Sequence, residues 1–143
     1  MKNMILAVAC ALALAAPALA SKKPGKAVIT ETSQLEWKKL AEGVHMAVVE
    51  GDPGKGSSHF FIKYAAGLNA PLHHHSPDHY VALVSGNLVL GFEGKETRLT
   101  PGSYFSFTKK AVHSARCEEG ADCIMFGDAR GKWDVQMEND KKQ

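Results

Sequence analysis

The chain has 143 residues, with 45% hydrophobic and 22% charged side chains, which is enough for one hydrophobic core but not for two independent domains. Its formal net charge is only +2, and its lysines are scattered or gathered at the two ends. We therefore expect no nucleic-acid partner and no binding to an anionic lipid surface.

Residues 1–20 have the organisation of a secretory signal peptide. Lys2 supplies the positive charge, residues 4–15 are apolar, and Ala18-Leu19-Ala20 is a small-residue cleavage site. The apolar run is too short to span a membrane, and no stop-transfer pattern follows it. We expect a periplasmic or secreted protein, cleaved near Ala20, whose mature chain has no membrane contact.

Three further segments follow the predicted signal peptide. Residues 21–43 are expected to be a flexible N-terminus and a short helical or extended lead-in, with one helical turn in the region of 33–40. Residues 44–135 should form the folded domain. Residues 136–143 form a polar C-terminal tail.

The folded domain is predicted to consist of strands, because no convincing helical period occurs after residue 43. Short apolar runs alternate with turn signals such as Ser85-Gly86-Asn87 and Pro101-Gly102. Strands this short and closely spaced favour an antiparallel sandwich or barrel, and we assign an all-β fold. The expected strands are residues 45–50, 59–65, 79–85, 88–92, 96–99, 104–107, 112–117 and 123–127.

Four histidines form the most specific pattern in the chain: His73, His75, His79 and His113. A spacing of two places the imidazoles of His73 and His75 on one face of an extended segment, whereas His74 should point the other way. The other two lie in neighbouring apolar runs. Imidazole is the commonest protein ligand for late first-row divalent metals, so the pattern predicts one metal site.

Other interpretations of the histidines stay open. A plain barrel without a metal is one, and a surface patch that sequesters metal is another, although the patch does not explain His79 and His113. His45 and His59 are assigned structural or surface roles. Asp78, next to a predicted ligand, either orients an imidazole or is simply solvated.

The cysteines indicate a disulfide. Cys10 belongs to the apolar run of the signal peptide, which leaves Cys117 and Cys123 in the mature chain. The residues between them, Glu-Glu-Gly-Ala-Asp, have turn chemistry and join two predicted strands. In an exported protein we expect the pair to be bonded. The alternatives are two separate small core residues or a reduced pair near the metal.

The spaced histidines resemble the first motif of the cupin superfamily. Residues 67–86 read G-x5-H-x-H-x3-H-x6-G, and the family usually has a glutamate where His79 stands here. The second family motif is matched by Gly102 and His113 but departs at three positions, Thr108, Lys110 and Cys117. The resemblance covers residues 44–127 and implies a jelly-roll barrel, also called a double-stranded β-helix.

The resemblance also implies roles for the histidines. His73, His75 and His113 match the family's metal histidines, and His79 matches the position of the carboxylate ligand. Cupins with four histidines are a known variant, so a site is still implied. The chain is similar to small exported single-domain cupins, and because cupins often associate through sheet edges, a homodimer is a further expectation.

Four neutral imidazoles would leave a divalent ion its full charge. Such a centre favours an anionic ligand, for example an enolate, a carboxylate or hydroxide. It disfavours magnesium and calcium, which prefer oxygen ligands, and it leaves iron, manganese, copper, nickel and zinc as candidates.

The leading functional hypothesis is a metal-dependent, dioxygenase-type oxidoreductase acting on a small organic molecule. With a redox-inert ion, Lewis-acid chemistry would replace oxidation. No catalytic acid or base can be named from the sequence. The rival hypothesis is a non-catalytic metal or small-ligand binding or sensor module, and it differs in needing no exchangeable position on the metal.

Overall fold

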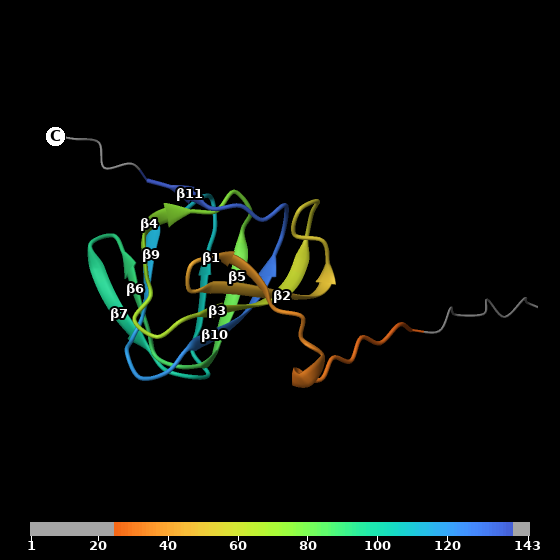
Figure 1. Ribbon diagram of the computed structural model, residues 1–143. Helices are drawn as coiled ribbons and strands as arrows, with labels where there is room; N and C mark the ends of the chain where they lie inside the picture. Colours follow the sequence, from red (N-terminus) through yellow and green to blue (C-terminus); the bar gives the residue numbers. More distant parts are fainter. Residues whose placement is uncertain (1–24, 139–143) are drawn as a thin grey trace, which may run out of the picture.

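The fold consists of two antiparallel β-sheets that face each other (Figure 1). The computed structural model describes residues 25–138, so the predicted signal peptide lies outside the described residues. A 3-10 turn, η1 (Thr32–Gln34), precedes eleven strands, which are β1 (Lys38–Ala41), β2 (Val44–Gly51), β3 (Ser58–Tyr64), β4 (Asn69–His74), β5 (His79–Ser85), β6 (Leu88–Phe92), β7 (Lys95–Leu99), β8 (Tyr104–Phe107), β9 (His113–Cys117), β10 (Cys123–Ala129) and β11 (Gln136–Met137).

The order of the strands is that of a jelly-roll barrel. One sheet runs β1-β2-β3-β10-β5-β8, and the other runs β11-β4-β9-β6-β7. From β3 onward the chain passes repeatedly from one sheet to the other, so strands that are distant in sequence become neighbours. This arrangement confirms the predicted all-β, antiparallel jelly-roll fold. Within residues 25–138, no helix is both long and apolar enough to cross a membrane.

The predicted strand ranges correspond to β2, β3 and β5 to β10, and the extended segment expected at His73 and His75 corresponds to the end of β4. The start of β4, together with β1 and β11, was not predicted. β4 contains Pro71, which lacks a backbone N–H and breaks the strand pattern. The register between β4 and β9 shifts between Ala70 and His73, around this proline. In the lead-in, where one helical turn was expected in the region of residues 33–40, the structure has the 3-10 turn η1 at Thr32–Gln34, and the strand β1 occupies Lys38–Ala41.

The first residues of the predicted C-terminal tail form a strand. Gln136 and Met137 make β11, which pairs with His74 and His73 of β4. Their side chains are exposed, so the pairing rests on the backbone and leaves no apolar signal in the sequence. The prediction that the polar tail begins at residue 136 therefore has to be corrected for these two residues.

The core lies between the two sheets and follows the two-residue alternation of the strands. In β5, His79, Val81 and Leu83 face inward, and in β10 the inward positions are Cys123, Met125, Gly127 and Ala129. Leu83, Leu88, Cys117 and Cys123 are completely or almost completely buried. A second cluster, formed by Met46, Phe60 and Ala129, packs against Trp133.

A disulfide joins Cys117 at the end of β9 to Cys123 at the start of β10, as predicted. Because these strands belong to different sheets, the bond ties the two sheets together. Gly86 approaches it closely: its φ is +77°, and an added Cβ would lie 2.8 Å from the Cα of Cys123. Both the backbone conformation and the lack of space therefore require glycine here.

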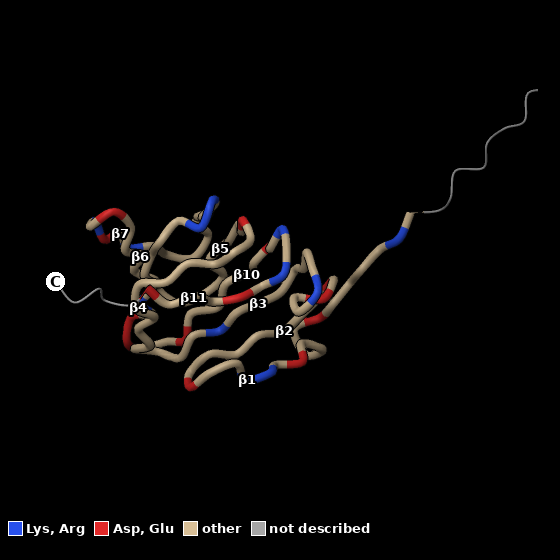
Figure 2. The backbone as a smooth tube through the Cα atoms, turned by 90° about the horizontal axis from the view of Figure 1, so that it is seen from above, with Lys and Arg blue, Asp and Glu red and all other residues tan. Residues whose placement is uncertain are grey.

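Basic residues (Lys, Arg) and acidic residues (Asp, Glu) are interspersed along the backbone (Figure 2).

Removing the disulfide should destabilise the protein. A loop this short contributes about 2–3 kcal/mol by restricting the unfolded chain, so the double substitution Cys117→Ala/Cys123→Ala should lower the free energy of unfolding by about that amount in urea titrations. Two titratable thiols in oxidised, denatured wild-type protein would contradict the disulfide.

Candidate metal centre

Four buried histidines meet at one end of the space between the sheets. His73 lies in β4, His75 directly after it, and His79 and His113 begin β5 and β9. Each side chain is buried, with residue exposures of 3–6%. The ring centroids of His73 and His113 are 4.4 Å apart, and those of His75 and His79 are 4.7 Å apart.

The strand pairing explains why these side chains converge. His73 and His113 are direct partners in the antiparallel register of β4 and β9, so they share the inner face of that sheet. His75 follows His73 by two residues and faces the same way. His79 comes from the opposite sheet, where it pairs with Ala129 and Phe107.

Three of the four histidines are close enough together to hold one metal ion. One ring nitrogen from each of His73, His75 and His113 lies within 4.8 Å of the others. Metal–nitrogen bonds are about 2.0–2.1 Å long, so small ring rotations would bring all three onto one ion. The His79 ring borders this triad, with its centroid 5.8 Å from that of His113.

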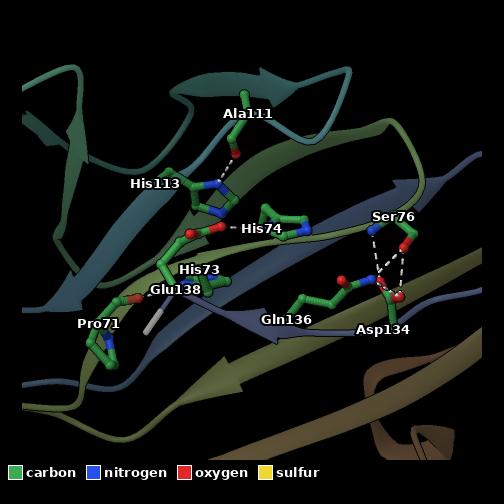
Figure 3. Close-up of polar contacts among 9 residues, drawn as sticks. All are labelled: Pro71, His73, His74, Ser76, Ala111, His113, Asp134, Gln136 and Glu138. Carbon is green, nitrogen blue, oxygen red and sulfur yellow. Dashed lines mark hydrogen bonds and ion pairs between the residues drawn. The ribbon is translucent and has the colours of Figure 1, made fainter. Parts of the chain in front are cut away.

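Backbone carbonyls fix the orientation of all four rings. The Nδ1 atoms of His73 and His113 lie 2.6 and 2.9 Å from the carbonyl oxygens of Pro71 and Ala111 (Figure 3). The Nδ1 atom of His79 lies 3.3 Å from the carbonyl oxygen of Pro77. His75 Nδ1 is 2.5 Å from the carbonyl oxygen of Asp134. A carbonyl can only accept, so each Nδ1 carries the hydrogen, and each neutral ring keeps a free lone pair on Nε2.

Burial keeps these imidazoles neutral. Desolvation lowers the pKa of His75 to about 3 and that of His113 to about 4, despite the hydrogen bonds from Nδ1. The same cause lowers the pKa of His73 and His79. Neutral imidazole is the form that binds a metal, so these rings need not lose a proton to bind one at neutral pH.

Aromatic side chains enclose the histidines. The ring of Phe107 stacks on His113 at 3.8 Å, and Trp133 stacks on His75 at 4.0 Å. Trp133 also meets His79 edge-on, at 5.3 Å. Trp133 was not among the predicted site residues, although a single tryptophan in a polar stretch that ends the domain is itself a signal of burial.

The histidines open onto a small apolar cavity with a volume of about 50 Å³. Apart from the histidines, Tyr64 is the only ionisable residue among those that line it, and burial raises the pKa of its phenol, so it stays protonated. The lining is otherwise apolar, with Phe60, Ile62, Val81, Leu90, Phe105, Ala115, Met125, Gly127 and Trp133.

The remaining sequence candidates lie outside the cavity. His74 points away from it, and its Nδ1 contacts Glu138 at 2.8 Å (Figure 3). His59 lies between Glu50 and Asp128 on the outer face. The carboxylate of Asp78 accepts a hydrogen bond from the backbone N–H of Lys109, so it anchors the loop before His113 and not an imidazole.

The metal-free protein should lose stability in acid. Histidines in the unfolded chain have a pKa near 6.5. Below that pH they are protonated in the unfolded chain but stay neutral in the folded chain, so the free energy of unfolding falls. Between pH 7.5 and pH 5, His75 and His113 should each contribute a loss of about 2 kcal/mol.

Urea titrations in EDTA at the two pH values measure this loss. His113→Gln should reduce the difference in the free energy of unfolding between the two pH values, because it removes one histidine whose pKa is lowered by folding. A free energy of unfolding that does not change between pH 7.5 and pH 5 would contradict neutral burial of the imidazoles.

Comparison with solved structures supports the fold. A cupin from Ralstonia eutropha JMP134, described as RmlC-like, is 24% identical with a TM-score of 0.64, over 79% of this chain and 73% of that one. The polyketide cyclase RemF from Streptomyces resistomycificus is 13% identical with a TM-score of 0.69, over 82% and 89%. A chain in the Rhodobacter sphaeroides complex of SigE with the anti-sigma ChrR is 19% identical with a TM-score of 0.56, over 69% of this chain and 50% of that one.

Comparison with curated proteins found no match. The family comparison is decisive, because residues 25–130, most of the chain, match the family described as the ChrR cupin-like domain. The two facing sheets, the jelly-roll strand order and the buried histidine triad agree with that match. The chain therefore belongs to the ChrR cupin-like family of the cupin superfamily.

Proposed function

We propose that this protein binds one divalent transition metal through His73, His75, His79 and His113 and uses it to act on a small organic molecule. The observation that carries the proposal is the state of the four rings. Each is buried and neutral, each gives its Nδ1 hydrogen to a backbone carbonyl, and each faces the same cavity with Nε2 free.

His79 is the proposed fourth ligand. It has the same backbone support as the triad, through the carbonyl of Pro77, and its pKa is lowered by the same burial. Its hydrogen bond is the longest of the four, at 3.3 Å, so its ring is the least tightly fixed and can turn toward an ion held by the other three. Nitrogen-only ligands favour iron, manganese, copper, nickel or zinc over magnesium and calcium.

The cavity supports chemistry on a small molecule. When bound, a redox-active ion supplies electron transfer with oxygen or substrate, and zinc supplies Lewis acidity. Around it, the apolar walls exclude water, and Tyr64 keeps its proton. Four neutral ligands leave the ion its charge, so we infer an anionic substrate and favour oxygen-dependent oxidation as the reaction.

A sensor without turnover is the second candidate. Two observations favour it: the match to a ChrR cupin-like domain and the similarity to a structure that contains the anti-sigma ChrR. Within the described residues, the cavity also offers no carboxylate to act as a base.

We also propose that the protein works outside the cytoplasm. The disulfide between Cys117 and Cys123 supports this, because such bonds persist in oxidising compartments. The signal-like composition of residues 1–20 supports it independently.

Histidine substitutions test the metal site. Protein without an affinity tag should carry about one equivalent of metal by elemental mass spectrometry, because all four predicted ligands face one cavity. His73→Ala and His113→Ala should each lose most of it, and His79→Ala should lower the affinity. The control is His74→Ala, which points away and should keep the metal. Equal occupancy in all five proteins would contradict the site.

An anionic probe separates the two candidate functions. If the centre keeps an open position, azide added to copper-loaded protein should produce a new charge-transfer absorption band, and the metal-loaded protein should consume oxygen with a suitable enolate or carboxylate. A closed centre that ignores azide would contradict the enzymatic proposal and leave the sensor.

A further inference from the structure

We propose that residues 131–138, here called the strap, hold His75 in place and thereby set how tightly the centre binds its ion. The strap leaves the end of β10 in one sheet and crosses the top of the barrel to reach β4 in the other (Figure 1). The proposal rests on the metal-binding function put forward above.

His75 differs from the other three histidines in how its ring is held. His73, His79 and His113 each use the carbonyl two residues earlier in their own segment. His75 instead uses the carbonyl of Asp134, 59 residues away in sequence. The orientation of three rings is thus a local property of their strands, whereas the orientation of the fourth depends on a distant segment.

A second contact from the strap acts on the same ring. Trp133 stacks on His75 at 4.0 Å with an interplanar angle of 23°, and it meets Phe60 edge-on at 5.0 Å. The tryptophan is itself fixed, because its backbone N–H donates to the carbonyl of Pro53 at 2.8 Å. The His75 ring therefore has a hydrogen-bond acceptor at its Nδ1 and an indole against its face, both from the strap.

The side chain of Asp134 fastens the strap to the residue after His75. Its carboxylate accepts from the N–H and the hydroxyl of Ser76, at 2.7 Å each, and from the Gln136 amide at 2.9 Å (Figure 3). Burial would raise the pKa of Asp134, but these hydrogen bonds lower it to about 2. The carboxylate therefore stays ionised and keeps all three donors at neutral pH.

The far end of the strap is fastened to the same strand. β11 pairs with His74 and His73, the N–H of Glu138 donates to the carbonyl of Leu72, and the Glu138 carboxylate contacts His74. All of these partners lie in β4, which carries His73 and leads directly to His75. The family match ends at residue 130, so the strap lies outside the matched residues.

Coupling between the strap and the ion is reciprocal. If the docked strap raises metal affinity by some factor, bound metal must stabilise docking of the strap by the same factor. The proposal therefore has two readouts, one at the metal and one in the backbone of the strap.

The first readout is metal affinity, measured with cobalt(II) in competition with a chelator. Asp134→Ala removes the carboxylate that aligns the strap, and Ser76→Ala removes one of its donors. Asp134→Ala should weaken cobalt binding about 10-fold, the lower end of the loss that follows removal of a group supporting a metal ligand, because the carboxylate acts by positioning the Asp134 carbonyl. It should also change the visible spectrum of bound cobalt. Asp134→Asn keeps an acceptor for Ser76 and should restore part of the affinity.

The matched control is Val135→Ala. Val135 is the neighbour of Asp134, and 54% of it is exposed, so its truncation leaves the contacts of the strap intact. It should bind cobalt as the wild type does. Circular dichroism of each variant checks that the barrel is folded.

The second readout is amide hydrogen exchange in the wild-type protein. Metal should slow exchange in residues 132–138 more than in the distant strand β7. Failure of wild-type protein to bind any metal would overturn the proposed function and this inference with it. Metal binding by the wild type with unchanged affinity in Asp134→Ala, or with no added protection of the strap, would overturn the inference alone.

Discussion

The structure depends on burying four imidazoles between two sheets while leaving one nitrogen of each ring free. A buried polar ring is unfavourable unless its donors and acceptors are paired. The fold meets half of this requirement, because a backbone carbonyl takes the Nδ1 hydrogen of every ring. The Nε2 atom of each ring faces an apolar cavity and has no partner among the described residues of the protein. These unpaired Nε2 lone pairs are what would allow the site to bind an ion.

The carbonyls that hold the rings come from places where the sheet pattern is interrupted. Pro71 and Pro77 lie two residues before His73 and His79, and the register of β4 shifts around Pro71. The carbonyl of Pro71 thus lies outside the paired register of β4 with β9 and is free to accept from the imidazole. In an uninterrupted strand, this carbonyl would pair with the neighbouring strand and would not orient the imidazole. Functional sites commonly depart from regular structure in this way.

Much of this could be predicted from the sequence, because strand alternation and histidine spacing are local signals. The apolar runs gave eight of the strands, and the motif from Gly67 to Gly86 led to the cupin fold. The start of β4 was not predicted because Pro71 interrupts its pattern, and β11 was not predicted because its exposed side chains carry no pattern. The role of Trp133 and Asp134 depends on a contact across 59 residues, which spacing cannot reveal.

The dependence of His75 on the strap bears on both candidate functions. An enzyme needs its ligands held in one geometry, and the hydrogen bond and the indole stacked on His75 do this from outside the strand. A sensor needs a segment whose docking changes with the ion, and a two-residue strand at a sheet edge is held by few contacts. The same strap meets both needs, so its presence does not select between them. The enzyme and the sensor differ in whether the ion keeps an open coordination position toward the cavity, because turnover requires one and sensing of the ion alone does not.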